Sequence, residues 1–350
     1  MKILVYLDWP ATEGLKPPSS FTTLLLPALC ESLAGHEVLV WTYGLERPPG
    51  LVLPGNPEWT AFPGKNGLAG WWWRFRTLPS RIRAAAPDHL LVVNAASPLK
   101  GIKHSLLVEG NRNFTICRGS GKDRGPAAIF RFGAFAPHAP KDIQPVPVID
   151  VHLVRPASAG FGPLEPASME ATRLVHTGGR SYFIYMGPLD PGVTDLVKAF
   201  SVFKKRQKSD WKLVLAGQGE INRKFVESLS YYKYREDLVL FRETNPAIMP
   251  SLIGAAYAVL VPAGGGTEWL PEVLAAGVPA IVPDQPAFRG SADETFSFYD
   301  TVSQTDIAET MMTLYKDESL RNRRRQAGLA LATAASWQDL ARQITAHLLK

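Results

Sequence analysis

The feature that most constrains the fold is a repeated alternation between short apolar runs and helical segments. An apolar run at residues 2–7 predicts a buried strand, residues 21–33 predict a helix, and residues 37–42 predict a second strand. Strands that are joined through a helix run parallel in the same sheet. The alternation continues through the second half of the chain, so the sequence predicts an α/β fold with two Rossmann-like lobes.

The chain divides at a segment rich in proline and glycine, residues 155–166, which has the composition of a linker. We therefore predict an N-terminal lobe at residues 1–160, a C-terminal lobe at residues 161–335 and a final helix at residues 336–350. Residues 110–147 are rich in Gly, Pro, Arg and Phe and read as irregular. In the C-terminal lobe, we predict strands at residues 182–186, 212–216, 238–241, 258–261 and 280–282 and helices at residues 194–206, 222–230, 247–256, 270–276, 307–315 and 318–333.

Composition excludes several classes of protein and site. The 350 residues include only two cysteines, Cys30 and Cys117, too few for a disulfide framework or a zinc site built on cysteine pairs. The seven histidines are scattered without ligand spacing, so we predict no metal site. The apolar start is too short for a signal peptide, and no apolar run approaches the ~20 residues of a membrane span, so we expect a cytoplasmic protein. The net charge of +6 favours an anionic partner without choosing one.

Residues 258–283 carry the strongest chemical signal. A strand at residues 258–261 is followed by Gly264, Gly265 and Gly266, and a helix then begins near Leu270. The sequence that closes this helix is Gly-Val-Pro, which prevents its continuation. A strand end, a glycine-rich turn and a helix start are typical of anion-binding sites, because free N–H groups and the helix dipole favour a phosphate.

The same helix carries a family resemblance. Residues 272–279, EVLAAGVP, resemble the second half of the Glu, seven residues, Glu motif of the retaining family 4 glycosyltransferases (glycosyl transferases group 1). The other matching segments are residues 33–42, 182–189 and 212–219, Lys198-Ala199-Phe200, and the Ser336-Trp337 pair. The resemblance is strong over residues 180–345. It implies a GT-B fold, in which two Rossmann-like lobes face an interdomain cleft and the C-terminal helix crosses back to the first lobe.

The resemblance also implies roles for individual residues toward a nucleoside diphosphate sugar. Glu272 would accept hydrogen bonds from the ribose hydroxyls, and the backbone near Leu270 and Pro271 would hold the diphosphate. Gly264, Gly265 and Gly266 would let the ligand approach the backbone.

Three further glycines have implied positions in the C-terminal lobe. Gly187 would let the nucleotide pass close to the first strand of this lobe, and Gly217 and Gly219 would lie near the base. GT-B enzymes are generally expected to work without a metal, so no cofactor is predicted beyond the sugar donor as co-substrate.

The chain departs from the family where the sugar and the diphosphate are normally held. The first Glu of the motif falls on Gly264, and Glu268 is the nearest carboxylate that would replace it. The family's Arg and Lys after Gly-x-Leu-x-Pro are replaced by residues 192–194, Gly-Val-Thr. A leaving diphosphate needs cations or dipoles to stabilise its charge. These departures leave two interpretations open.

The first interpretation is a glycosyltransferase that moves a hexose from a nucleoside diphosphate sugar to a glycan, lipid or small-molecule hydroxyl with retention. Its candidate catalytic residues are Glu268 and Glu272. The second is a GT-B protein that has lost catalysis and acts as a nucleotide-sugar binding or partner subunit. A nucleotide-sugar epimerase is a weaker third interpretation, because the matching stretch is that of the transferases.

Two clusters of basic residues have competing interpretations. Residues 71–76, WWWRFR, have the composition of a membrane-surface anchor, which would place the protein at the inner face of a membrane. The interpretation that we favour is a helix that packs its aromatic side chains on the first lobe. The four arginines of residues 321–325 are interpreted as a solvated helix face, and no nucleic-acid partner is predicted.

Overall fold

The computed structural model describes most of the chain. The chain divides into two compact units. The described residues are 1–8, 24–44, 46–47, 51–63, 67–93, 104–109, 128–132, 148–151, 157–158, 160–187, 189–217, 222–241, 245, 247–262, 269–285, 288–289, 293–301, 305–334 and 336–349. One unit comprises Met1–Arg155 together with Ser336–Lys350, and the other comprises Pro156–Ala335. We call them the first unit and the second unit.

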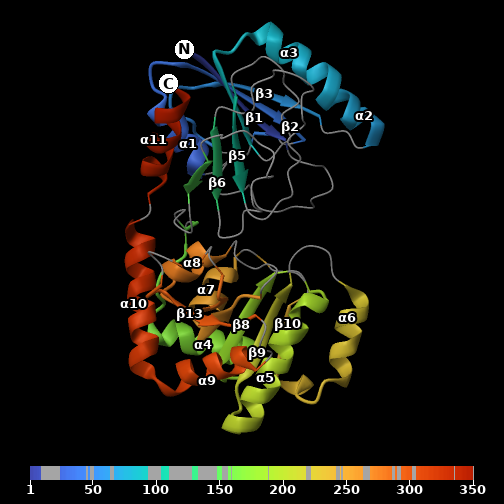
Figure 1. Ribbon diagram of the computed structural model, residues 1–350, viewed down its shortest axis with the longest axis vertical. Coiled ribbons are helices and arrows are strands. Elements are labelled where there is room, and N and C mark those ends of the chain that lie inside the picture. The colour runs from blue at the N-terminus through green and yellow to red at the C-terminus, as the bar shows by residue number, and fades with distance from the viewer. Residues whose placement is uncertain are drawn as a thin grey trace. The chain divides into compact units, whose positions relative to one another are not determined.

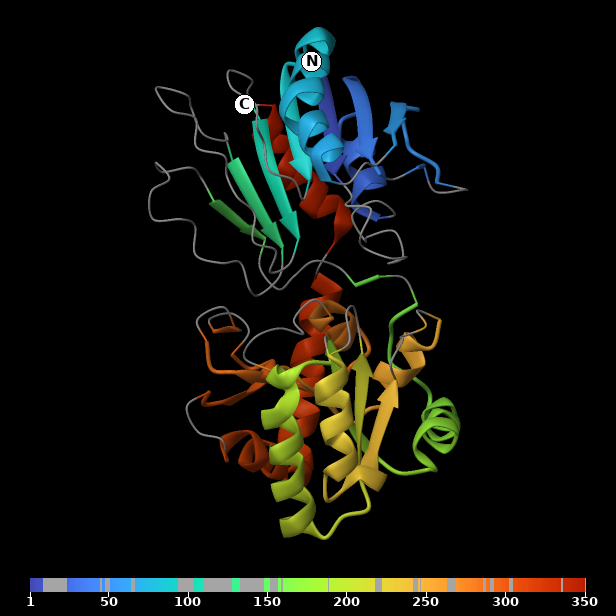
Figure 2. The same cartoon turned by 90° about the vertical axis from the view of Figure 1, so that its right-hand side faces the viewer.

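The first unit is built on a seven-stranded parallel sheet with the order β3-β2-β1-β4-β5-β6-β7 (Figures 1 and 2). The chain starts in a central strand, moves to one edge, and then crosses over to build the other side. This is the doubly wound order of Rossmann-like folds. The strands are β1 (Lys2–Asp8), β2 (Glu37–Tyr43), β3 (Glu58–Phe62), β4 (His89–Val93), β5 (His104–Glu109), β6 (Ala128–Phe132) and β7 (Val148–Val151).

Alternate residues of β1 supply two separate cores, as side chains in a strand point to opposite faces. Ile3 and Val5 belong to the core that includes helices α1 (Leu26–Ser32) and α11 (Trp337–Leu348). Leu4 and Tyr6 belong to the core on the other face, with residues of α3 (Leu78–Ala85). Both faces of the sheet are therefore covered, as a parallel sheet requires.

Helix α11 is an integral part of the first unit although it lies near the C-terminal end of the chain. Its N-cap is Ser336, whose Oγ accepts a hydrogen bond from the backbone N–H of Asp339 at 3.3 Å. The hydroxyls of Ser32 in α1 and Thr345 in α11 are hydrogen-bonded at 2.6 Å. The apolar face of α11 consists of Leu340, Ala341, Ile344 and Leu348, all buried in the core that holds α1.

The second unit is built on a six-stranded parallel sheet with the order β10-β9-β8-β11-β12-β13. Its first strand is again central, its next two strands form one side, and the last three form the other. The strands are β8 (Tyr182–Gly187), β9 (Lys212–Gly217), β10 (Leu238–Phe241), β11 (Ala258–Leu260), β12 (Ala280–Pro283) and β13 (Phe296–Tyr299).

Helices cover both faces of this sheet. Phe183 of β8 lies in an aromatic core with Phe200 and Phe203 of α5 (Thr194–Gln207), and α9 (Asp306–Lys316) adds Met311. On the other face the hydroxyl of Tyr182 donates to the Leu252 carbonyl of α7 (Met249–Gly254) at 2.6 Å. The remaining helices are α4 (Pro166–Thr177), α6 (Arg223–Ser228), α8 (Leu270–Ala275) and α10 (Glu318–Ala334). No helix among the described residues has the length and apolar character needed to cross a membrane.

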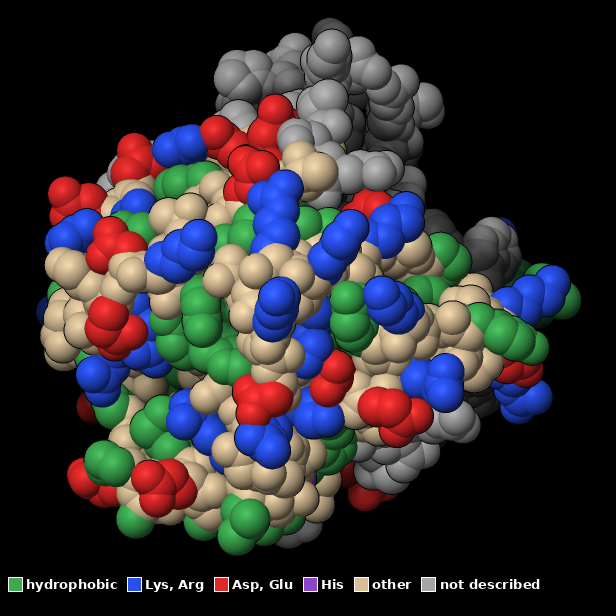
Figure 3. Space-filling view, turned by 90° about the horizontal axis from the view of Figure 1, so that it is seen from below, with side chains coloured by type: hydrophobic (Ala, Val, Ile, Leu, Met, Phe, Trp, Pro, Cys, Tyr) green, Lys and Arg blue, Asp and Glu red, His purple; other side chains and the backbone are tan. Residues whose placement is uncertain are grey.

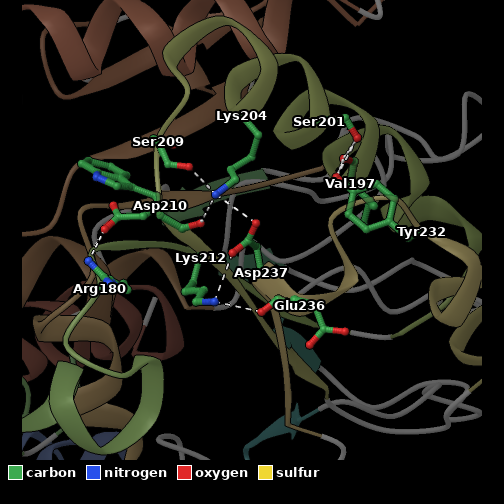
Figure 4. A network of polar contacts seen from close by, with 11 residues as sticks. Arg180, Val197, Ser201, Lys204, Ser209, Asp210, Lys212, Tyr232, Glu236 and Asp237 are labelled. Carbon is green, nitrogen blue, oxygen red and sulfur yellow. Dashed lines mark hydrogen bonds and ion pairs between the residues drawn. The ribbon is translucent and has the colours of Figure 1, made fainter.

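A partly buried polar network joins the amino ends of β9 and β10 (Figure 4). The ammonium of Lys204, at the end of α5, pairs with Asp237 Oδ2 at 2.9 Å and donates to the carbonyl of Trp211 at 3.2 Å. Lys212 pairs with the other oxygen of Asp237 at 3.1 Å. Burial alone would raise the pKa of Asp237, but the hydrogen bonds from the two lysines outweigh it and lower the pKa. These contacts connect the end of α5 to the starts of β9 and β10. They lie at the edge of the sheet opposite the carboxyl ends of its strands.

The surface seen from below carries charges of both signs (Figure 3). Lys and Arg side chains are interspersed there with Asp and Glu. Exposed ion pairs in the second unit include Arg180 with Asp210 and Arg206 with Glu309.

The prediction of a solvated arginine face on α10 is wrong for Arg321, because its guanidinium lies 4.2 Å from the centre of the Tyr257 ring and its side chain is only 16% exposed.

Candidate functional site

The site lies at the carboxyl ends of β8 and β11, where the strand order of the second unit reverses. Successive connections leave this point in opposite directions, which opens a crevice above the sheet in doubly wound folds. Strand β8 ends at Gly187 and β11 ends at Leu260. Helix α8, which carries Glu272, is the first described helix after β11. Several residues that the sequence singled out thus lie at the carboxyl ends of these strands or in the helix that follows.

Gly187 and Gly217 are paired across β8 and β9 at the last position of each strand. The backbone of Gly187 has φ +153°, and a Cβ there would lie 2.6 Å from the Tyr185 hydroxyl oxygen. A Cβ on Gly217 would lie 2.6 Å from a Leu189 methyl carbon and 2.9 Å from the Phe241 carbonyl oxygen. Packing inside the unit is therefore sufficient to explain why Gly217 has no side chain.

Glu272 is a buried carboxylate in the first turn of α8, with only 1% of its surface exposed. Its Oε1 accepts two hydrogen bonds from Ser158, one from the backbone N–H at 3.0 Å and one from the hydroxyl at 2.9 Å. The two residues are 114 positions apart in the sequence. A carboxylate has about four lone-pair positions and only accepts when ionised, so this arrangement suits hydroxyl groups as partners.

Helix α8 is closed at its carboxyl end, and the strand before it is held by a buried tyrosine. Gly277 follows its last turn with φ +67°, a left-handed conformation that favours glycine, and its N–H donates to the carbonyl of Leu274 at 3.0 Å. Before the helix, the hydroxyl of Tyr299 donates to the Val261 carbonyl at 3.0 Å, and burial raises the pKa of this phenol. The predicted stop at Gly-Val-Pro is confirmed.

The start of α8 is apolar and buried. Leu270 and Pro271 are both buried, and Pro271 occupies the first turn, where its missing N–H costs no hydrogen bond. Trp269 lies just before the helix, and the centre of its ring is 6.1 Å from that of Phe161. The indole N–H of Trp269 is buried without an acceptor in the part of the chain that the structure describes. A buried donor of this kind costs free energy until a partner accepts from it.

Other predicted site residues lie outside the described residues. These are Gly219, Gly264, Gly265, Gly266 and Glu268. Ser158 is a site residue that sequence reasoning missed, since it lies in the segment interpreted as a linker and no local motif marks it. Within the described ranges, no group of three or more His, Cys, Asp or Glu side chains is placed to hold a metal ion.

Comparison with known proteins bears on the fold and on part of the second unit. Residues 170–330 match the model of a family described as "Glycosyl transferases group 1". No curated protein matches the chain. Among solved structures, a glycosyltransferase from Rickettsia africae is similar with a TM-score of 0.69 at 11% identity, covering 99% of this chain and 96% of that one. WaaG, a glycosyltransferase involved in lipopolysaccharide biosynthesis, has a TM-score of 0.65 at 15% identity and covers 99% of both chains.

The fold is GT-B. The Anabaena protein Alr3699/HepE, solved in complex with UDP, is also similar, with a TM-score of 0.62 at 13% identity over 100% of this chain and 99% of that chain. At such identities the likeness establishes the fold and leaves the reaction to be argued from the site. Within this GT-B chain, the family match covers most of the second unit, including Gly187, Gly217 and α8. The GT-B fold predicted from the sequence is therefore confirmed.

Proposed function

We propose that this protein is a glycosyltransferase that moves a hexose from a nucleoside diphosphate sugar to a hydroxyl acceptor with retention of configuration. The observation that carries the proposal is Glu272, a buried carboxylate at the reversal point of a GT-B donor-type unit, inside the segment that matches group 1 glycosyltransferases. In this role Glu272 accepts hydrogen bonds from the ribose hydroxyls of the donor.

Similarity to HepE supports a nucleotide ligand, because that protein was solved in complex with UDP. The position of Gly187 adds to this support, since it ends β8 at the reversal point where α/β folds bind nucleotides. The indole N–H of Trp269 is a further donor at this edge of the sheet, suited to an oxygen of the ligand. The acceptor is a hydroxyl of a glycan, a lipid or a small molecule.

The proposal is tested by donor binding and turnover in the purified full-length chain. A thermal-shift panel of UDP-, GDP- and ADP-sugars identifies the base, because a ligand stabilises the folded state in proportion to the logarithm of its concentration over its dissociation constant. We expect Glu272→Gln to weaken nucleotide binding by about tenfold or more, because each lost hydrogen bond to a charged group is worth roughly 1.5–3 kcal/mol. The matched control is Glu236→Gln, whose side chain is 85% exposed at the opposite edge of the sheet.

Each outcome of this experiment has a defined meaning. Donor binding with release of nucleoside diphosphate, and a product whose anomeric configuration matches the donor by NMR, supports the proposal. If a donor binds but is neither transferred to an acceptor hydroxyl nor hydrolysed, the protein is a nucleotide-sugar binding subunit and the proposed transferase function is wrong. Equal donor binding by Glu272→Gln and the wild type would remove Glu272 from the site.

A further inference from the structure

A continuous helical segment of the first unit carries four arginines and no acidic residue. It runs through α2 (Gly67–Trp72), a π-helical turn (Trp73–Thr77) and α3. From residue 59 to residue 87 the chain has five Lys or Arg residues and no Asp or Glu. We call residues 67–85 the basic helical segment. Its charge is thus of one sign, unlike the mixed surface of the second unit.

The inner side of the basic helical segment is fixed on the sheet. Leu78 and Ile82 are buried in the core that contains Leu4 and Tyr6. Trp73 stacks on Tyr43 of β2 with ring centres 5.4 Å apart. The interpretation that the aromatic run packs on the first lobe is therefore correct for Trp73, and this packing holds the segment in a defined orientation.

The outer side exposes large apolar groups beside arginine. Leu68 is 87% exposed and Trp72 is 55% exposed. Arg76 lies one further turn along, with its guanidinium 5.4 Å from the centre of the Trp72 ring. Leu68 and Trp72 are four residues apart in α2 and so share one face of the helix, and the contact with the Trp72 ring places Arg76 beside them. The core does not use these side chains, so their exposure calls for another explanation.

We infer that this face docks on a membrane surface that contains anionic lipids. Tryptophan is favoured at the headgroup level because its ring is apolar and its N–H is polar. Arginine next to it meets lipid phosphates, and leucine reaches the acyl boundary, as in helices that lie in the interface plane. Residues 59–87 carry only positive charges, which complement the negative charge of an anionic lipid surface. An acidic protein partner would be attracted by the arginines but would not require Leu68 to protrude.

This docking is independent of the proposed reaction, so it is tested by binding alone. The full chain is sedimented with vesicles of phosphatidylcholine, or of phosphatidylcholine mixed with phosphatidylglycerol, at low and high salt. We expect binding to the anionic vesicles that weakens with salt, because the attraction is screened. The double variant Leu68→Ser, Trp72→Ser and the single variant Arg76→Glu should each lower the fraction bound by about tenfold or more, on the basis of this interfacial chemistry. Tyr231→Ser is the matched control, since Tyr231 is 89% exposed in the second unit.

Circular dichroism and thermal melting check that the variants fold. Trp72→Phe serves as a milder probe, because brominated lipid should quench its tryptophan fluorescence less than that of the wild type. Three results would overturn the inference: equal binding to neutral and anionic vesicles, no binding by the wild type, or full binding by the double variant. A wild-type dimer in sedimentation velocity that is lost in Trp72→Ser would also overturn it, by assigning the face to a second copy of the chain.

Discussion

At the scale of residues, the contact between Ser158 and Glu272 controls where the carboxylate points. Two donors from one residue hold Oε1 at 3.0 and 2.9 Å, which fixes the plane of the carboxylate. The backbone N–H remains in any variant, while the hydroxyl is removed by alanine. This separation makes Ser158 a residue whose positioning effect is measurable apart from its packing.

Ser158→Ala should weaken nucleotide binding by Glu272 several-fold and leave the fold intact, because one of the two hydrogen bonds from Ser158 to the carboxylate is lost at a cost of about 1 kcal/mol. Isothermal titration with the nucleotide found in the donor panel measures the change. Ser158→Thr keeps a hydroxyl and should recover most of the affinity. Unchanged affinity in Ser158→Ala would show that the contact has no part in orienting Glu272.

Sequence patterns located Glu272 but not Ser158, and the reason is physical. Glu272 lies in a local motif in which a helix start, Gly277 and Pro279 constrain one another within a few residues. Ser158 acts through a contact between positions 114 residues apart, for which the local sequence carries no signal. Gly217 shows a related ambiguity, since a glycine that lets a ligand approach and a glycine that accommodates Leu189 have the same sequence.

At the scale of elements, the network of Lys204, Lys212 and Asp237 joins α5 to the starts of β9 and β10 (Figure 4). The side chain of Lys204 is only 6% exposed, so its ammonium depends on the partners within the network. If the carboxylate of Asp237 is removed, the charged ammonium of Lys204 keeps only carbonyl groups as acceptors.

Asp237→Asn should therefore lower the free energy of unfolding by roughly 1–3 kcal/mol at pH 7, the cost of leaving a buried charged group without its partner. The pKa of Asp237 is lowered from its ordinary value of 3.8, so the stabilisation is present above pH about 3.8 and is lost as the pH falls through the lower, folded-state pKa. Urea unfolding of the wild type and the variant should show the same gap at pH 7 and pH 5, and a smaller gap below pH about 4.

The control for this prediction is Asp195→Asn, because Asp195 and its partner Lys198 are each 56% exposed and such pairs contribute roughly 0–1 kcal/mol. If the difference in free energy of unfolding between the wild type and Asp237→Asn already becomes smaller between pH 7 and pH 5, the pH dependence does not come from Asp237.

Burial alone does not decide which elements were predicted, since β13 has a buried face and was missed while β10 has no fully buried residue and was predicted. The predicted helix at residues 194–206 matches α5 (Thr194–Gln207), whose apolar side chains form a continuous buried face. Strand β3, which is short, lies at the sheet edge and has no fully buried residue, was missed. Helix α4 was missed because only Thr172 and Thr177 are buried while Leu174 and Val175 are exposed, so its apolar residues do not mark its inner face.

At the scale of the whole molecule, the first unit is assembled from two separated parts of the chain. Leu340, Ala341, Ile344 and Leu348 of α11 share a core with α1 and the sheet. Each large apolar side chain buried in this way contributes about 1.5–3 kcal/mol. Losing α11 therefore removes a large fraction of the stability of a typical domain, which is about 5–15 kcal/mol.

Deleting residues 336–350 should unfold or strongly destabilise the first unit while the second unit stays folded. Cys30 reports the loss directly, because it is 3% exposed in the same core and burial raises the pKa of its thiol to about 11. In a Cys117→Ser background, Cys30 should react slowly with a thiol reagent in the full chain and rapidly after the deletion. Equally slow reaction in both proteins would show that α11 is dispensable for this core.

The return of α11 has a consequence for the order in which the protein is made. Residues 156–335 form one contiguous stretch, so the whole of the second unit has been synthesised before α11 is made. The first unit begins at residue 1 but completes its core only when residues 337–348 have been synthesised. The half of the protein that is translated first is thus the half that finishes folding last, and until then the nascent chain exposes the apolar face of α1 to any chaperone that can reach it.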